Sequence, residues 1–287
     1  MLPNFLIVGA LRSGTTSLYN TLADHSSVYF PDLKEPRFFS SFTQKAKNGP
    51  GDRMIPFIES WETYKSLYKD TGAVKAVGDA SVENLYLHNK VIPYIHKYLG
   101  DVKIIILLRN PYERAISAYK YLLMKGRELF TFKEALEKEK YRINNHYLPI
   151  WYYKSNGYYY NQIKSYQDSF SSVKIILFED LLFEPQKTFS SILKFLEIDD
   201  MSDQNIFKIK NASGGNNIIY HFHAKSFLRY MNKTLSPKLR PYFLKLMNEL
   251  INNYQDINLK QYLNGCYNED IIKLEKLINR DLRNWLE

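Results

Sequence analysis

The chain has 287 residues, 45% of them hydrophobic and 24% charged, which fits one large globular domain. Its net charge of +9 favours a polyanionic partner such as a nucleotide or an acidic glycan, and no basic block or aromatic–basic repeat indicates a nucleic-acid partner. Cys266 is the single cysteine, which excludes an intrachain disulfide, and no stretch approaches the ~18 apolar residues of a transmembrane segment, so a soluble, cytoplasmic protein is expected.

The N-terminal stretch predicts a phosphate-binding turn between a strand and a helix. Residues 5–8 indicate a buried strand, the turn runs from Gly9 to Gly14, and a helix is expected over about residues 15–23. Such a turn points backbone N–H groups and the positive end of the helix dipole at one anion. The glycine spacing is that of a P-loop, but Thr15 stands where the P-loop lysine belongs, and the positive charge is Arg12. An ordinary glycine turn without a ligand is the alternative.

Strand-like and helix-like segments alternate along the rest of the chain. Strands are expected at residues 28–30, 74–78, 102–108 and 173–178. Helices are expected at residues 61–68, 91–99, 112–124, 131–140, 157–169 and 185–196, with an irregular segment at 34–39 and a loop at Glu179–Asp180. This alternation predicts an α/β fold, a doubly wound parallel sheet flanked by helices.

Polar clusters follow three of the predicted strands, at residues 12–16, 79–81 and 109–117. Because ligands of such sheets bind at the carboxyl ends of the strands, these clusters are expected to meet. In the third cluster, Arg109 ends a buried strand, Pro111 can start the next helix, and Ser117 lies roughly two turns further on. An arginine fork beside a hydroxyl suits a second phosphate group. The alternative for Arg109 is a capping or structural ion pair.

The C-terminal part of the chain differs in character. Residues 207–217 are polar and glycine-rich and predict a loop, and amphipathic helices are expected at 224–231, 237–252 and 268–285. With no internal repeat and no long linker, residues 1–287 are predicted to form a single domain. It would comprise an α/β core over about residues 1–200 and a C-terminal helical appendage over about residues 201–287.

The two phosphate motifs together resemble those of sulfotransferases that use 3′-phosphoadenosine 5′-phosphosulfate (PAPS). Residues 9–19 are similar to the 5′-phosphosulfate loop of that family, and residues 108–119 resemble its 3′-phosphate motif. Further segments are similar to the heparan-sulfate-type and related bacterial branch: residues 34–39, 157–163, 178–182 and 274–285. The resemblance covers nearly the whole chain and implies transfer of a sulfuryl group from PAPS to an acceptor hydroxyl or amine.

The resemblance also implies a role for each matched residue. Arg12 would be catalytic as well as cofactor-binding, because it would neutralise the charge that builds on the leaving phosphate oxygen. The other implied PAPS-binding residues are Ser13, Gly14, Thr15, Thr16, Arg109 and Ser117. A looser match implies that Lys210, Ser213 and Gly214 belong to a loop that closes over the cofactor. No metal is expected, because a sulfuryl group carries less negative charge than a phosphoryl group and these donors can suffice.

Glu35 matches the general base of the family and would take the proton of the acceptor. The alternative is an exposed glutamate paired with Lys34 or Arg37. The cytosolic branch of the superfamily uses a histidine base instead, which leaves three competitors. These are His25, His88 and His146.

Three further residues are predicted to contact the acceptor: Lys34, Asp79 and Tyr159. A strand-end cap is the alternative for Asp79, and a buried core aromatic is the alternative for Tyr159. Ala80 stands where the heparan-type branch often has a lysine, which argues against a heparan-like substrate. The candidate acceptors are a cell-surface or capsular saccharide, a lipid-linked glycan and a small natural product.

Two other function classes stay open at this point. A P-loop nucleotide kinase or NTPase would need Mg²⁺ and a loop lysine. A non-enzymatic polyanion-binding module would use the +9 charge without preferring one nucleotide. The sequence does not predict the oligomeric state.

Overall fold

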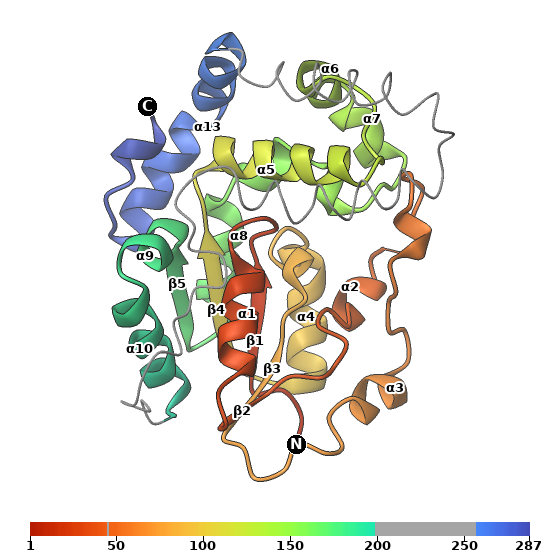
Figure 1. Ribbon diagram of the computed structural model, residues 1–287, viewed down its shortest axis with the longest axis vertical. Helices are drawn as coiled ribbons and strands as arrows, with labels where there is room; N and C mark the ends of the chain where they lie inside the picture. The colour runs from red at the N-terminus through yellow and green to blue at the C-terminus, as the bar shows by residue number, and fades with distance from the viewer. Residues whose placement is uncertain (45, 199–256) are drawn as a thin grey trace, which may run out of the picture.

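A five-stranded parallel sheet forms the centre of the protein, whose computed structural model describes residues 1–44, 46–198 and 257–287 (Figure 1). The strands are β1 (Phe5–Gly9), β2 (Val28–Tyr29), β3 (Ala76–Asp79), β4 (Lys103–Leu108) and β5 (Val173–Leu177). Their order is β2-β3-β1-β4-β5, and each neighbouring pair is parallel. The predicted doubly wound sheet is confirmed. The chain changes direction across the sheet between β1 and β4, which is where ligands bind in such folds.

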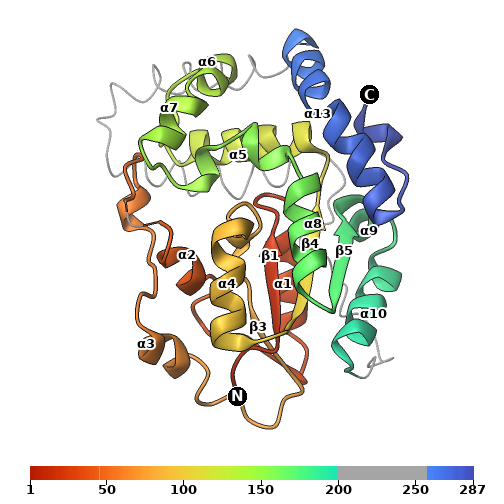
Figure 2. The same cartoon turned by 180° about the vertical axis from the view of Figure 1, so that it is seen from behind.

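Residues of the strands alternate between two hydrophobic layers. The helices that cover the sheet are α1 (Thr15–Ala23), α4 (His88–Leu99), α8 (Tyr160–Ser169) and α10 (Pro185–Leu196). In β1, Phe5 and Ile7 pack with α1 and α10, whereas Leu6 and Val8 pack with α4 and α8. Figures 1 and 2 show these helix pairs on opposite faces of the sheet. Each large apolar side chain buried in these layers contributes roughly 2 kcal/mol.

Helix α5 (Pro111–Met124) crosses the carboxyl ends of the strands (Figures 1 and 2). It begins directly after β4, because the Asn110 side chain accepts hydrogen bonds from the N–H groups of Tyr112 (3.0 Å) and Glu113 (3.2 Å). Pro111 takes the first helical position, where a missing N–H does no harm. The helix therefore carries its side chains across the sheet edge at which β1 also ends.

The segment predicted as one helix at residues 131–140 is two helices, α6 (Phe132–Glu137) and α7 (Glu139–Asn144). A capping box between Thr131 and Glu134 starts α6. Two short α-helices are described between β2 and β3, on either side of a 3-10 helix at Asp52–Met54. These are α2 (Phe38–Ser41) and α3 (Trp61–Ser66).

The loop predicted at Glu179–Asp180 is wrong, because these residues form the first turn of α9 (Phe178–Phe183). Asp180 accepts a hydrogen bond from the Leu177 N–H (3.0 Å) and pairs with Arg280 (2.7 Å). A carboxylate at this end of a helix satisfies a backbone donor and interacts favourably with the helix dipole. The strand therefore passes directly into a helix.

Helix α13 (Ile257–Ile278) packs against α8 and α5. Its Asp270 accepts a hydrogen bond from the Tyr159 N–H (2.7 Å) at the start of α8. The helix predicted at 268–285 begins earlier, at Ile257, and also ends earlier, at Ile278. It ends there because Asn279 has a φ of 50°, through which an α-helix does not continue. The helices predicted at 224–231 and 237–252 lie outside the described residues. Within the described ranges, every helix is too short or too polar to span a membrane.

Candidate active site

The first predicted phosphate-binding motif occupies the turn between β1 and α1. Arg12 and Gly14 both have positive φ values, 69° and 91°, so the chain reverses within this turn. A Cβ atom at Gly14 would lie 2.9 Å from the ring of Phe178, which only a glycine avoids. Ser13 and Thr15 are buried, and Thr16 is exposed. The turn thus opens the N-terminus of α1 toward the carboxyl edge of the sheet.

The second motif lies at the junction of β4 and α5. The guanidinium of Arg109 lies 4.8 Å from the ring centre of Phe178 and 3.4 Å from a carboxylate oxygen of Glu113. The Glu113 side chain is 52% exposed, so solvent screens this ion pair. Burial lowers the pKa of Arg109, although an arginine stays protonated at physiological pH. Among the described residues, Arg109 makes its one ion pair with the exposed Glu113, and the carboxylate of Glu179 adds a weaker attraction.

The structure brings these two motifs together. Arg12 Nε donates a hydrogen bond to Ser117 Oγ (3.3 Å), and the Arg12 guanidinium stacks 4.6 Å from the ring centre of Tyr121 on the same face of α5. Phe178 contacts both the Gly14 turn and Arg109. Burial lowers the pKa of Arg12, and the nearby positive charge of Arg109 acts in the same direction. Two partly buried cations at adjoining strand ends favour a bound polyanion.

Residues 34–39 form the third part of the site. Phe38 and Phe39 are fully buried, and Phe38 stacks on Tyr64 with ring centres 4.6 Å apart, which holds this segment against the core. Lys34 Nζ donates to Thr16 Oγ1 (2.7 Å) and lies 3.5 Å from Glu35 Oε1. Lys34 therefore connects the first phosphate motif to the predicted base. Burial lowers the pKa of Lys34, against the opposing attraction of Glu35.

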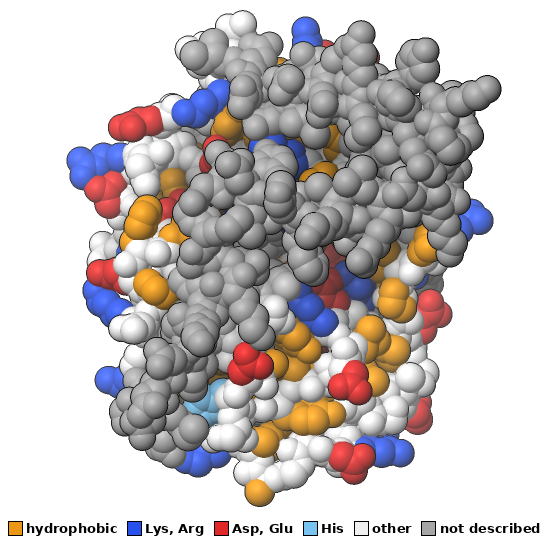
Figure 3. All heavy atoms as spheres, viewed as in Figure 1, with side chains coloured by type: hydrophobic (Ala, Val, Ile, Leu, Met, Phe, Trp, Pro, Cys, Tyr) orange, Lys and Arg blue, Asp and Glu red, His pale blue; other side chains and the backbone are white. Residues whose placement is uncertain are grey.

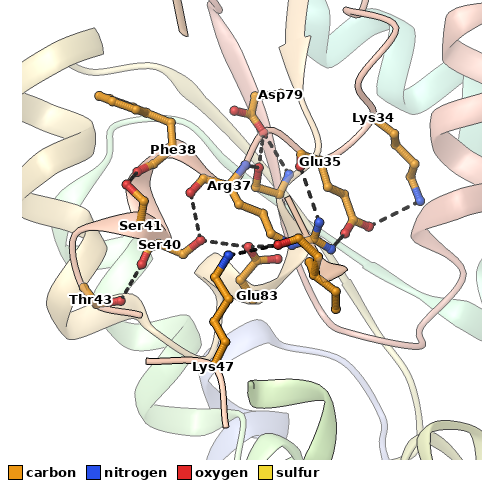
Figure 4. Close-up of polar contacts among 12 residues, drawn as sticks. Lys34, Glu35, Arg37, Phe38, Ser40, Ser41, Thr43, Lys47, Asp79 and Glu83 are labelled. Atoms are coloured by element: carbon orange, nitrogen blue, oxygen red, sulfur yellow. Dashed lines mark hydrogen bonds and ion pairs between the residues drawn. The ribbon is translucent and has the colours of Figure 1, made fainter. Parts of the chain in front are cut away.

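Glu35 is paired with both neighbours that the sequence indicated. Its Oε2 accepts a hydrogen bond from Arg37 Nη2, and its side chain is 19% exposed (Figure 4). The pairing that served as the alternative to catalysis is therefore present, but in a partly buried position beside the phosphate turn. Figure 3 draws the face of the molecule that Figure 1 views, and basic and acidic side chains lie next to one another near its middle.

Asp79 and Tyr159 lie behind the surface of the site. Asp79 is 1% exposed and accepts hydrogen bonds from Tyr64 Oη (2.8 Å), Ser81 Oγ (2.7 Å) and the Ser81 N–H (2.8 Å). Tyr159 is fully buried and donates to the carbonyl of Arg109 (2.9 Å). Burial raises the pKa of Tyr159 to about 12. Asp79 holds Ser81 and Tyr159 holds the Arg109 backbone through these hydrogen bonds. Their predicted contacts with the acceptor stay predictions.

The other predicted residues include the competing histidines and the C-terminal cofactor loop. His25 is buried where α1 ends, opposite the phosphate turn, and its Nδ1 accepts from the Ser27 N–H (3.1 Å). Burial lowers the pKa of His88. Three predicted cofactor residues lie outside the described part of the chain. These are Lys210, Ser213 and Gly214.

Four residues of this region were not predicted as site residues from the sequence: Arg37, Tyr121, Phe178 and Glu83. Tyr121 could have been found, because it lies four residues after Ser117 and so shares its helix face. No sequence signal places Phe178 beside Gly14 and Arg109, since those contacts join the first residue of α9 to the segments that follow β1 and β4. Glu83 follows β3 and reaches Arg37 only through tertiary packing.

Comparison with known proteins agrees with this geometry. The model of a family described as "Sulfotransferase family" matches residues 3–203, more than half of the chain. The chain is 32% identical to the membrane-associated sulfotransferase kil1 of Dictyostelium discoideum over 121 residues, which cover 42% of this chain and 23% of that protein. It is 24% identical to carbohydrate sulfotransferase 15 of Mus musculus over 165 residues, which cover 46% of this chain and 29% of that protein. The chain thus spans less than a third of the length of these two relatives.

Solved structures provide longer matches. The crystal structure of a sulfotransferase from Alicyclobacillus acidocaldarius has a TM-score of 0.80 and 31% identity, with 100% of both chains covered. The sulfotransferase domain of the curacin biosynthetic pathway has a TM-score of 0.50 and 15% identity, covering 87% of this chain and 98% of that one. The second likeness concerns the fold alone.

Proposed function

Because the chain belongs to the sulfotransferase family, we propose that it moves a sulfuryl group from PAPS to a hydroxyl or amine of a saccharide or small natural product. The observation that carries this proposal is the hydrogen bond from Arg12 Nε to Ser117 Oγ (3.3 Å). It joins the two motifs that resemble the two phosphate-binding motifs of PAPS-dependent enzymes. Two separate anion sites at one sheet edge suit a nucleotide that is charged at both ends.

The residues present fit such a nucleotide. The Ser13 hydroxyl is fully buried beside Tyr159, and within the described residues no well-formed hydrogen bond satisfies it. A buried polar atom of this kind is unfavourable unless a ligand or water pairs with it. Gly14 leaves the backbone of the turn open, and the N-terminus of α1 adds its dipole. Ser13, Gly14, Thr15 and Thr16 would hold the 5′ end, while Arg109 and Ser117 would hold the 3′-phosphate.

The chemistry needs a base on one side of the sulfur and charge stabilisation on the other. PAPS supplies the sulfur atom: the acceptor forms a bond to it while the bond from sulfur to the 5′-phosphate oxygen breaks. Glu35 would take the acceptor's proton, and Arg12 would stabilise the negative charge left on the phosphate. Lys34, which contacts Thr16, would keep Glu35 beside the phosphate turn. Positioning and electrostatics of this kind account for most of the barrier reduction in related phosphoryl transfers.

Several finer assignments belong to this proposal. Residues 1–287 would act as one domain in a soluble, cytoplasmic setting, with Lys210, Ser213 and Gly214 closing over the nucleotide. Lys34, Asp79 and Tyr159 would belong to the acceptor side, and Tyr159 would also hold the Arg109 backbone beside the 3′-phosphate.

Incubation with ³⁵S-labelled PAPS and a panel of saccharides, phenols and amines tests the proposal. We expect label to move to one acceptor class and 3′-phosphoadenosine 5′-phosphate (PAP) to form in equal amount. A thermal-shift comparison separates the nucleotide-kinase alternative, because PAP should stabilise the protein far more than Mg-ATP does. Equal stabilisation by both, with all label retained in PAPS, would contradict the proposal.

A further inference from the structure

Arg37 lies between two carboxylates that come from different segments of the chain (Figure 4). Its Nη2 donates to Glu35 Oε2, and its Nε lies 3.2 Å from Glu83 Oε1. The exposed fractions of the three side chains are 18% for Arg37, 19% for Glu35 and 5% for Glu83. One guanidinium therefore links the predicted base, on the loop after β2, to a buried carboxylate at the end of β3.

The backbone of Arg37 is held as firmly as its side chain. Its φ is 55°, a left-handed conformation that a non-glycine residue adopts only when surrounding contacts impose it. The Arg37 N–H donates to Ser81 Oγ (2.9 Å), and Ser81 in turn donates to Asp79 Oδ1 (2.7 Å). These contacts come from the carboxyl end of β3 and the residues directly after it, so the central sheet anchors the backbone that carries the guanidinium.

Glu83 is suited to keep Arg37 in this place. Its Oε1 also accepts a hydrogen bond from Ser40 Oγ (2.8 Å) on α2. Burial raises the pKa of Glu83, and Arg37 opposes that effect. Burial alone would lower the pKa of Arg37, but Glu83 and Glu35 outweigh it and the pKa lies above its usual value. A buried carboxylate and a buried guanidinium each stabilise the charged form of the other.

We propose that Glu83 and Arg37 are positioning residues that hold the Glu35 carboxylate in its proton-accepting orientation. The proposal rests on the role of Glu35 in the proposed function. Arg37 engages Oε2 of Glu35, while Oε1 faces Lys34 at 3.5 Å, a separation too long for a strong hydrogen bond. Oε1 therefore retains lone pairs for an incoming proton. Glu83 acts through Arg37 and touches neither the nucleotide turn nor the Glu35 carboxylate directly.

A double-mutant cycle between Glu83→Gln and Glu35→Gln tests this role. Gln has the shape of Glu and keeps an acceptor for Ser40, but it lacks the charge that holds Arg37. Turnover is measured as ³⁵S leaving labelled PAPS, with the acceptor that the wild-type enzyme labels or with water. We expect Glu83→Gln to lower kcat about 10- to 100-fold with the KM for PAPS within about twofold. In the Glu35→Gln background, the same change should matter less than about threefold. Independent, multiplicative losses would overturn the proposal.

A structural measurement gives a second test that needs no turnover. Crystal structures of the PAP complex are compared for the wild type, Glu83→Gln and Arg37→Ala. We expect the Glu35 carboxylate to leave its wild-type position in both variants while PAP stays in place. An unmoved Glu35 side chain in both variants would contradict the positioning role.

The matched control is Glu128→Gln, which removes another buried ion pair. Glu128 is 1% exposed and pairs with Arg142 (2.7 Å), in the α6–α7 region away from Arg37. We expect this variant to lower the melting temperature without coupling to Glu35→Gln.

Calorimetry with PAP distinguishes a failure of the proposed function from a failure of the positioning role. A wild-type protein that does not bind PAP by calorimetry disproves the proposed function, whereas normal PAP binding with an additive cycle disproves only the positioning role.

Discussion

Positive charge is compensated differently in two regions of this site. The nucleotide side is the region around Arg12 and Arg109, where we propose that PAPS binds, and the Glu35 side is the region around Glu35 and Arg37. Within the described part of the chain, Arg12 contacts the uncharged Ser117 and Tyr121 and makes no ion pair, and Arg109 makes one ion pair, with the exposed carboxylate of Glu113. Arg37, by contrast, contacts two carboxylates and is compensated within the protein. A cation without a buried counterion attracts an anionic ligand, whereas a compensated cation fixes its neighbours. The first region is built to receive charge from outside, and the second keeps its own charges in place.

The largest expected effect is the loss of kcat when the Glu35 side alone is changed. Glu35→Gln removes the proton acceptor but keeps the shape of the side chain, so kcat should fall about 10²- to 10⁴-fold. The Kd for PAP, measured by calorimetry, should stay within about twofold, because the nucleotide side is intact. Glu62→Gln on the exposed face of α3 is the control and should leave both quantities unchanged. Loss of PAP binding in Glu35→Gln would show that the two sides are not separate.

The next largest expected effect is the loss of PAP affinity when the nucleotide side is changed. Arg109→Ala should raise the Kd for PAP about 100-fold, since it removes charge-assisted hydrogen bonds to the 3′-phosphate worth about 3 kcal/mol. Arg109→Lys keeps the charge without the planar fork and should give an intermediate loss of about tenfold. Calorimetric titration with PAP measures both. A change of less than twofold in Arg109→Ala would place the 3′-phosphate elsewhere.

A smaller effect tests whether the turn itself depends on its glycine. Gly14→Ala should lower the free energy of unfolding by about 1–3 kcal/mol in urea titrations, because φ is 91° and the new methyl would meet Phe178 at 2.9 Å. Gly265→Ala is the matched control within α13, where a Cβ meets no atom within 4 Å. It should stabilise the protein by about 0.5–1 kcal/mol. Similar effects at both glycines would refute the strained turn.

The smallest expected effect is the different response of PAP binding and of kcat to ionic strength. Raising the ionic strength should weaken PAP binding several-fold, because Arg12 and Arg109 attract the ligand across partly solvated space. The same change should leave kcat at saturating PAPS nearly constant, since Arg37 and its two carboxylates are mostly buried. Initial rates and calorimetry at two salt concentrations provide the comparison. A kcat that falls in parallel with affinity would argue against an internally fixed Glu35.

Local patterns were sufficient to predict the parallel sheet and the place of both motifs at its carboxyl edge. A buried strand followed by a glycine turn, and another followed by Asn110–Pro111, are decided by residues close together in the sequence. The contact between Arg12 and Ser117 also follows, because strands that end in polar clusters meet at one edge of a parallel sheet. The amino-acid sequence alone is therefore enough to infer these features of the site.

Other features depend on packing between distant segments. Glu83 becomes a site residue only because Arg37 takes a left-handed conformation that Ser81 supports. Phe178 enters the site because β5 passes directly into α9, where the sequence suggested a loop. Helix boundaries near residue 279 likewise depend on a single positive φ. None of these is encoded in a local hydrophobic period, so sequence patterns alone do not show them.

A crystal structure of the protein with PAP tests most directly whether two strand ends hold one nucleotide. We expect the 3′-phosphate within hydrogen-bonding distance of Arg109 and Ser117, and the 5′-phosphate at the backbone N–H groups of residues 13–16, with the Arg12 guanidinium beside it. A nucleotide bound in the reverse orientation, or bound without contact to Arg109, would contradict this account.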